Sequence, residues 1–328
     1  MLNTITDVPG ILVGHAQDER AGTGCTVVLC EAGATAAVDV RGGAPGTRET
    51  DCLDASNIIP QVQAVYLGGG SAYGLDGASG VMRYLDEKAI GFDVGVCTVP
   101  IVPGAVIFDL TVGDCRTRPD AAMGYRACKA AGTAVAQGNA GAGTGAGIGG
   151  DHSLPLAARM MKGGLGTASV KQGDLIVGAI VVVNCFGDVI DTATGEVLAG
   201  LLSEDRQRLA GRAQLLASLP GASGFFPGNT TIGVVATNAR LDKGQARRVA
   251  MMAQDGFARA IDPIHTMHDG DSIFALATGD IEANVTLIGV LAAQAMAVAI
   301  ANGVRAAQTA YGLPCHEDMK DRLKTSRR

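Results

Sequence analysis

The sequence predicts a mixed α/β fold, and two observations support that prediction. Of the 328 residues, 47% are apolar and 47 are glycines that follow no Gly-X-Y period. This glycine content is typical of many tight turns and close backbone approaches, and it excludes collagen. Strand-like β-branched runs and stretches of helical period also occur along the same chain. The length is compatible with two domains or with one large one.

The first half of the chain contains strands, a helix after a glycine-rich turn, and one further long helix. Its predicted elements are, in order, strands over 25–29 and 35–40 joined by a turn at 32–34, a short helix over 51–58, a strand over 62–67, and helices over 71–88 and 120–134. Residues 100–114 contain two prolines, so we expect this segment to be extended or loop-like.

Glycine-rich segments interrupt these elements. The first, 68–74, lies between a strand and a helix, where such a turn can bind phosphate at the helix N-terminus. It fits neither a Walker loop nor a dinucleotide-binding unit, so we expect a tight turn that lines a pocket. Residues 138–150 are almost entirely glycine, alanine and threonine. We expect this segment, and a second one at 162–168, to be loops packed against another backbone rather than linkers.

The second half continues the mixed pattern. Its predicted elements are a strand over 175–184, a helix over 201–219, a strand over 230–235, a helix over 243–261, a strand over 273–278 and a helix over 282–310. The strand over 175–184 is nearly all apolar, so we expect both of its faces to be buried. Residues 285–304 form the longest apolar stretch, but they are mainly alanine with three polar residues. We therefore predict a buried core helix and no membrane span.

Charge and aromatic content argue against a nucleic-acid partner. The formal net charge is −6, aromatic residues make up 4%, and tryptophan is absent. A basic surface and stacking platforms for bases are therefore not expected. The eight cysteines form no Cys-X-X-Cys pair, and no basic region followed by an apolar run opens the chain. We expect reduced thiols in a cytoplasmic protein without a signal peptide.

The junction between Asn229 and Thr230 lies where a loop rich in glycine, proline and phenylalanine, 220–228, meets the β-branched run 230–235. Thr230 has two interpretations. In the first it opens a strand. In the second the peptide bond before it breaks, and Thr230 becomes a new N-terminus. It then holds both a hydroxyl nucleophile and an α-amino base, which titrates at about pH 8. The preceding loop is the best candidate for an exposed processing loop.

Asp269 and Asp271 flank a glycine, and His265 and His268 precede them. The default interpretation of Asp-Gly is a turn. A metal site is an alternative, but no His-Glu-X-X-His pattern or Cys/His cluster supports it. Near an N-terminal threonine, a carboxylate pair has a different use. One member orients the nucleophile, and repulsion between the two raises one pKa so that this group can exchange a proton.

Several of these segments, in this order along the chain, resemble one known family. They are Gly-Gly-Gly-Ser-Ala-Tyr-Gly-Leu at 68–75, Val-Ile-Phe-Asp at 106–109, Val-Asn-Cys-Phe-Gly at 183–187, Asn-Thr-Thr-Ile at 229–232, and His-Thr-Met-His-Asp-Gly-Asp at 265–271. Together they resemble the L-aminopeptidase/D-esterase (DmpA-like) peptidases, and within that family the nylon-oligomer (6-aminohexanoate oligomer) endo-hydrolase branch. The resemblance covers nearly the whole chain.

This resemblance implies a single domain over 1–328 with an α-β-β-α layered fold of the N-terminal nucleophile hydrolase type. It implies self-cleavage into an α chain, 1–229, and a β chain, 230–328, that stay together. Thr230 would be the nucleophile, Asn184 would donate to the oxyanion, and Asp269 and Asp271 would orient and tune Thr230. Thr231 is a rival nucleophile, but the family position directly after Asn229 favours Thr230. No metal or organic cofactor is implied.

The sequence departs from the family pattern at two places. In the nylon-oligomer branch, the glycine-rich loop that corresponds to 138–150 ends in a lysine that belongs to the catalytic group. Gly150 occupies the matching position here. Lys162 either replaces that lysine or belongs to its own loop, and we expect the second. In the β-peptidyl aminopeptidase branch a tyrosine lies near the oxyanion, whereas Phe108 occupies the matching segment. We therefore expect no aminopeptidase activity of that type, with Tyr73 as a candidate pocket residue.

Three functions are compatible with these observations. The predicted one is a self-processing amidase or peptidase that cleaves a small amide or peptide substrate through an acyl-Thr230 intermediate. The alternatives are an acyltransferase that uses the same nucleophile, and an unprocessed binding protein of the same fold. The resemblance also suggests a homo-oligomer, a tetramer or larger. We expect neither a nucleic-acid nor a membrane partner.

Overall fold

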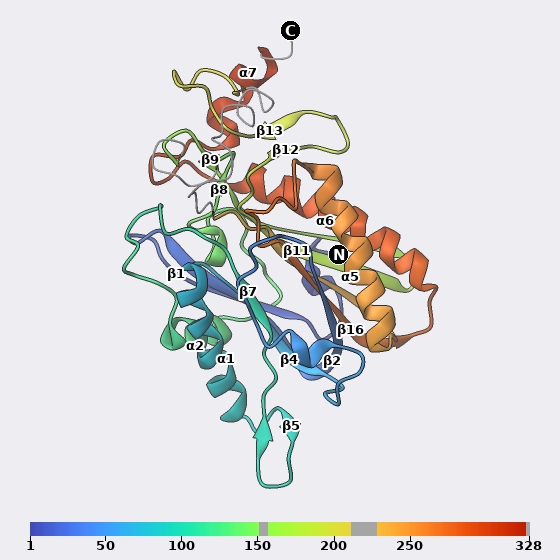
Figure 1. Cartoon of the computed structure of the whole chain (residues 1–328). Helices are drawn as coiled ribbons and strands as arrows, with labels where there is room; N and C mark the ends of the chain where they lie inside the picture. Colours follow the sequence, from blue (N-terminus) through green and yellow to red (C-terminus); the bar gives the residue numbers. More distant parts are fainter. Residues whose placement is uncertain (151–156, 211–227, 326–328) are drawn as a thin grey trace.

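In the computed structural model, nine strands among the described residues 1–150, 157–210 and 228–325 form a sheet that bends back on itself between two pairs of helices (Figure 1). The bend lies in strand β2 (Thr23–Val40). The first part of β2 pairs with β1 (Leu12–Asp18) and β4 (Val62–Gly68), and its last part pairs with β16 (Ser272–Ile281). The two halves face each other, so the predicted α-β-β-α layering is confirmed.

The strands that follow the Asn229–Thr230 junction lie in the middle of this sheet. The strand order is β10 (Gly164–Gln172), β11 (Leu175–Val183), β14 (Ile232–Ala239), β16, β2, β4, β7 (Gly104–Val106) and β3 (Thr47–Arg48), with β1 beside β2. β14 is antiparallel to β11 and parallel to β16, and β16 is antiparallel to β2. β14 and β16 are therefore enclosed on both sides by strands from earlier in the sequence.

Two pairs of helices cover the outer faces of the sheet. The pairs are α1 (Gly77–Asp86) with α2 (Ala121–Lys129), and α5 (Lys243–Ala260) with α6 (Val285–Ala306). Capping side chains determine where the second pair begins. Asp242 accepts a bond from the Gln245 backbone N–H at the start of α5, and Asn284 accepts one from the Thr286 backbone N–H at the start of α6.

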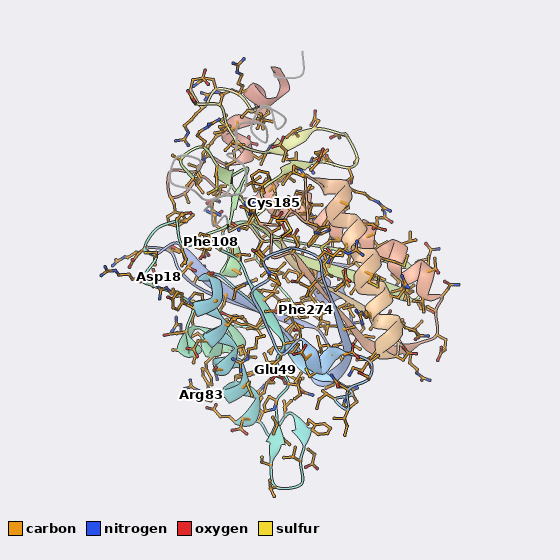
Figure 2. The ribbon with its side chains drawn as sticks, viewed as in Figure 1. Asp18, Glu49, Arg83, Phe108, Cys185 and Phe274 are labelled. Carbon is orange, nitrogen blue, oxygen red and sulfur yellow. The ribbon has the colours of Figure 1, made fainter. Side chains whose placement is uncertain are left out.

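Side-chain alternation divides the core into layers. On β11, Ile180 and Val182 face the space between the two halves of the sheet, whereas Val181 and Val183 face α5 and α6. On β16, Phe274 likewise lies in the core between the halves (Figure 2). A separate apolar cluster joins the other half of the sheet to α1 and α2. Each central strand therefore has two buried faces, as its apolar sequence predicts.

Helix α6 is the long apolar segment of the sequence. Within the described ranges it is the one helix long and apolar enough to cross a membrane, yet 72% of its apolar window is buried. It packs against α5, β10 and β11, so the prediction of a core helix is confirmed. A Cβ added at Gly166 of β10 would lie 2.0 Å from the Ala299 carbonyl oxygen, so helix and strand meet backbone to backbone.

Short elements complete the described chain. They are the 3-10 turns η1 (Ile5–Asp7), η2 (Asp51–Leu53), η3 (Ser71–Asp76) and η4 (Gly141–Gly143), the strands β5 (Phe92–Asp93), β6 (Thr98–Val99), β8 (Gly147–Ile148), β9 (Met161–Lys162), β12 (Asp188–Ile190), β13 (Val197–Ala199) and β15 (Ile261–Asp262), and the helix α7 (His316–Thr325).

The predicted turn at 32–34 is wrong. The two strands expected around it are one strand, β2, whose register with β4 shifts between Leu29 and Ala34. Gly33 adopts a φ of +89°, which glycine reaches without steric cost. The segment is thus a bulge, and it lets one strand serve both halves of the sheet.

Other predicted elements are shorter or different. The segment 162–168 is not a loop but belongs to β9 and β10. The helix expected over 51–58 is only the turn η2, and residues 201–210 contain a bridge between Leu202 and Leu209 in place of a helix. The rest of that predicted helix, 211–219, lies outside the described residues. The remaining predicted strands and long helices are observed with displaced ends.

Candidate active site

The Asn229–Thr230 peptide bond is held from both sides by backbone groups. The Thr230 N–H donates to the carbonyl oxygen of Asn184, directly after β11, at 2.7 Å. The Asn229 carbonyl oxygen accepts from the Gly270 N–H at 3.0 Å. Gly270 lies just before β16, in a segment that continues the parallel pairing of β14 with β16. The atoms of the bond predicted to break are therefore fixed by segments far apart in the sequence.

The Thr230 hydroxyl is buried against the carbonyl of its own junction. Its Oγ1 donates to the Asn229 carbonyl oxygen at 2.5 Å, and the residue is only 4% exposed. A Cβ added at Gly270 would lie 2.8 Å from Oγ1, so only glycine at this position leaves the hydroxyl its place. The nucleophile and the carbonyl that it is predicted to attack are thus in contact in the uncut chain.

The alternation of the sheet separates Thr230 from the carboxylates. Ile232 and Val234 of β14 face the space between the sheet halves, so Thr230 lies on that side too. The space at Gly270 faces Thr230, and Asp269 and Asp271 flank it in an extended segment. Their side chains therefore lie toward the α5 and α6 side. The structure brings all predicted site residues together at one junction, but it places the carboxylates across the backbone from the hydroxyl.

Asn184 lies on the same side as Thr230. Its side chain is fully buried, its Oδ1 accepts from the Gly147 N–H at 2.9 Å, and its Nδ2 donates to the Phe108 carbonyl oxygen at 3.2 Å. In Figure 2, Phe108 and Cys185, the residue after Asn184, lie toward the same end of the sheet, above Phe274. An amide has two N–H donors, so this fixed Nδ2 still has one for an oxyanion.

The two carboxylates are buried and bonded differently. Asp269 Oδ2 accepts from the Thr266 N–H at 2.8 Å and from Thr266 Oγ1 at 2.5 Å. Asp271 Oδ1 accepts from the Thr231 N–H at 2.7 Å, and its Oδ2 accepts from the His265 N–H at 3.0 Å. Burial raises the pKa of Asp269 to about 6, and the charge of Asp271 adds to this rise. Such a shift is what the sequence predicts for a close carboxylate pair.

Lys162 is a buried cation next to the loop that holds Asn184. Its Nζ donates to the carbonyl oxygens of Gly143, Ala146 and Gly163 at 2.8–2.9 Å. Burial lowers the pKa of Lys162 to about 7, and the charge of Asp109 opposes that decrease. Because only the ammonium form has three N–H donors, these three bonds fit the charged state.

Asp109 is a buried carboxyl whose charge acts on this cation. Its Oδ1 accepts from the Gly70 N–H at 2.6 Å, and its Oδ2 accepts from the Thr23 hydroxyl at 2.7 Å. Burial raises its pKa to about 6, whereas these two bonds and the charge of Lys162 lower it. Asp109 follows Phe108 directly, so it anchors the segment whose carbonyl binds Asn184.

The expectation that Lys162 belongs to its own loop is wrong. β9 pairs with β8, which places Lys162 opposite Gly147, the residue whose N–H holds Asn184. The lysine therefore supports the glycine-rich loop 138–150 through its carbonyl groups. Gly150, the position at which the sequence lacks a lysine, is buried at the end of the same loop. Strands of two residues have no periodic signature, so this pairing left no trace in the sequence.

A cavity of about 250 Å³ adjoins the junction. Its walls come from 44–46, 71–72, 106–108 and 228–230, with His268. Phe108 thus contributes its ring to the cavity as well as its carbonyl to Asn184. Tyr73 is 63% exposed, its ring is covered by the Arg118 guanidinium at 3.8 Å, and it is absent from this lining. The glycine-rich turn at 68–74 does line a pocket, but through Ser71 and Ala72.

Comparisons with known proteins place the chain in a family and identify proteins of similar fold. The model of peptidase family S58 matches residues 3–317. An uncharacterised aminopeptidase of Mycobacterium tuberculosis is 47% identical over 349 aligned residues, covering 97% of this chain and 98% of the relative. A 6-aminohexanoate-oligomer endohydrolase of Paenarthrobacter ureafaciens is 32% identical over 310 residues, covering 88% and 82%. The solved L-aminopeptidase D-Ala-esterase/amidase of Ochrobactrum anthropi superposes with a TM-score of 0.72 at 20% identity, over 99% and 94%.

Proposed function

Since the chain belongs to peptidase family S58 and is a hydrolase of amide or peptide bonds, we propose that it matures by cutting itself between Asn229 and Thr230. Thr230 then serves as the N-terminal nucleophile toward its substrates. The observation that carries this proposal is the contact of Thr230 Oγ1 with the Asn229 carbonyl, whose oxygen also accepts the Gly270 N–H. A nucleophile and an oxyanion donor converge there on one peptide bond.

The self-cleavage step is an N→O acyl shift. Thr230 Oγ1 attacks the Asn229 carbonyl carbon, a C–O bond forms, and the C–N bond of the peptide breaks. The hydroxyl proton ends on the leaving nitrogen, which becomes the α-amino group of Thr230. The Gly270 N–H stabilises the oxyanion, and a single donor of this kind is worth about 10²–10³ in rate. Water then hydrolyses the ester and leaves Asn229 as a free carboxylate.

The mature reaction uses the amine that the cut releases. That nitrogen already donates to the Asn184 carbonyl oxygen, so it is held beside its own hydroxyl. It removes the hydroxyl proton as Thr230 attacks a substrate amide, and then protonates the leaving amine. The free N–H of Asn184 Nδ2 donates to the new oxyanion, and water releases the acyl group. Asp271 fixes the backbone directly after Thr230 through the Thr231 N–H, whereas Asp269 fixes the preceding loop at Thr266.

Intact mass and a denaturing gel test the cut directly. We expect two chains, of which the second begins at Thr230. Thr230→Ala should remain one chain and hydrolyse nothing. Thr231→Ala is the matched control, since it removes the neighbouring hydroxyl and should still be cut. A Thr230→Ala chain that cuts at the same bond would overturn the proposal.

An amide panel tests the activity. Suitable members are amino-acid p-nitroanilides, short peptides, and linear 6-aminohexanoate oligomers, the last suggested by the name of the endohydrolase relative. We expect at least one to be hydrolysed by the cut protein and not by Thr230→Ala. Hydroxylamine added as an acceptor separates the two fates of the acyl group. Hydroxamate in place of acid would identify a transferase that uses the same nucleophile.

A further inference from the structure

His265 makes two contacts with Asp271 that have no part in the proposed self-cleavage or amide hydrolysis. Its ring Nδ1 lies 2.9 Å from Asp271 Oδ2, and its backbone N–H donates to the same oxygen at 3.0 Å. To do this, His265 adopts a φ of +59°, in the left-handed region that non-glycine residues rarely occupy. Residues with strained backbone conformations cluster at functional sites, so the contact of His265 with Asp271 indicates a functional role.

Asp271 connects His265 to the nucleophile. Its other oxygen, Oδ1, accepts from the N–H of Thr231, which belongs to the peptide bond directly after Thr230. The Asp271 side chain is fully buried, and the His265 ring packs toward Phe257 of α5 at 6.2 Å between centroids.

The remaining charges around this pair are few. Asp269 is the neighbouring acid, and the charges of Asp269, Asp271 and Asp188 all act on the thiol of Cys185. Phe257, the α5 side chain that faces the ring, carries no charge. Within 1–150, 157–210 and 228–325, no lysine or arginine side chain forms an ion pair with Asp269 or Asp271. His265 is thus the one side chain of basic type bonded to either acid in that part of the chain.

We propose that His265 is a positioning residue that holds Asp271 against the N–H of Thr231 and so fixes the peptide bond directly after the nucleophile Thr230. The proposal rests on Thr230 being the nucleophile. Asp271 has three donors, two of them from His265, whereas Asp269 Oδ1 is buried without a hydrogen-bond partner in the described structure.

The proposal makes a prediction about pH with a defined sign. Burial and the charge of Asp271 raise the pKa of Asp269, and the charge of His265 lowers it. Removing His265 removes this lowering, so the pKa of Asp269 rises. The acid limb of the rate profile, which the ionisation of Asp269 sets in this proposal, therefore moves to higher pH, by about one unit for the loss of a close favourable partner.

Three variants and a control test this. His265→Gly removes the ring and relieves the positive φ. His265→Asn accepts that φ and places an amide N–H where Nδ1 lies, whereas His265→Gln places it where Nε2 lies. His316→Asn is the control, because it removes an imidazole from α7, where Nδ1 contacts the Leu198 carbonyl oxygen. For each, the rate of self-cleavage of newly made chain and the rate on the best amide are measured between pH 5 and 9.

We expect His265→Gly and His265→Gln to shift the acid limb upward, His265→Asn to restore most of the wild-type profile, and His316→Asn to leave it unchanged. If His265→Gly does not fold, the Asn and Gln variants decide alone. A loss of rate that is equal at every pH, or an Asn profile no closer to wild type than the Gln profile, would overturn the proposal. Cutting of Thr230→Ala would instead overturn the nucleophile, so the two failures are distinguishable.

Discussion

At the scale of single residues, Lys162 shows how this site is supported. Transfer of an ammonium from water into a protein core is costly, and three carbonyl acceptors together with the charge of Asp109 offset that cost. The carbonyls of Gly143 and Ala146 belong to the loop that leads into Gly147, and Gly147 orients Asn184. The lysine therefore acts on the site through a backbone loop. This is a different task from touching the reacting atoms.

Lys162→Met should destabilise the protein strongly. The methionine leaves three buried carbonyl oxygens without their donor, and each buried acceptor left unpaired costs about 1–3 kcal/mol. Urea unfolding of the variant in the uncut Thr230→Ala background measures this loss. Lys171→Met, at the exposed end of β10, is the control and should change stability by about 0.5 kcal/mol or less. Equal stabilities for the two variants would show that Lys162 is not held as described.

At the scale of elements, glycines determine how closely α6 approaches the sheet. A Cβ at Gly166 would lie 2.0 Å from Ala299 O and 2.3 Å from Gly303 N, and a Cβ at Gly303 would lie 2.8 Å from Gly166 N. Helix and strand thus meet through positions that have no side chain on either partner. β10 pairs with β11, and Asn184, the proposed oxyanion donor, directly follows β11, so its position depends on this contact.

Gly166→Ala should therefore destabilise the protein by about 2 kcal/mol or more, because a methyl group cannot enter this backbone contact without moving α6. Gly132→Ala is the matched control, since a Cβ there meets nothing within 4 Å. Chemical unfolding of both variants in the Thr230→Ala background gives the comparison. A Gly166→Ala chain as stable as the control would mean that α6 packs less tightly against β10 than these distances require.

The sequence predicts the strands and long helices because their apolar patterns are local. The fold class, the buried strand that ends at Asn184 and the core helix α6 all follow from such patterns. The bend in β2 does not, because glycine and alanine at 32–34 are as typical of a turn as of a bulge. A single strand shared by two half-sheets is defined by its partners, which lie far away in the sequence.

For the site, the sequence supplies candidate residues but does not show how they are arranged in space. Asn229, Thr230 and the two aspartates are recognisable from their order along the chain. The supporting groups are not, because their role lies in long-range contacts: the Gly147 N–H on Asn184, the three carbonyls around Lys162, and His265 on Asp271. The His-Thr-Met-His-Asp-Gly-Asp motif did contain His265, but no local pattern shows that its ring turns back onto Asp271.

At the scale of the whole molecule, the residues after the junction supply the centre of the structure. β14 and β16 lie between β11 and β2, and α5 and α6 cover them. A cut before Thr230 leaves every one of these strand pairings intact. The hydrophobic surface between the two parts is that of a protein core, so the parts have no stable existence apart.

The cut protein should therefore behave as one particle until it unfolds. We expect 1–229 and 230–328 to elute together in size-exclusion chromatography without denaturant and to separate only at urea concentrations that also abolish the circular dichroism of the fold. The uncut Thr230→Ala chain should elute at the same volume as the cut wild type. Separate elution of the two parts in plain buffer would contradict the central placement of β14 and β16.

The backbone bonds that hold the junction have one more consequence. Asn184 and Gly270, which hold Thr230 N and Asn229 O, reach the junction only when β11 and β16 have both paired with β14. On the proposed self-cleavage, a nascent or misassembled chain lacks this arrangement and stays whole. The fraction of cut chain on a denaturing gel then measures the fraction of molecules that have completed folding. This measurement needs no substrate, so it can compare the folding yields of variants inside living cells.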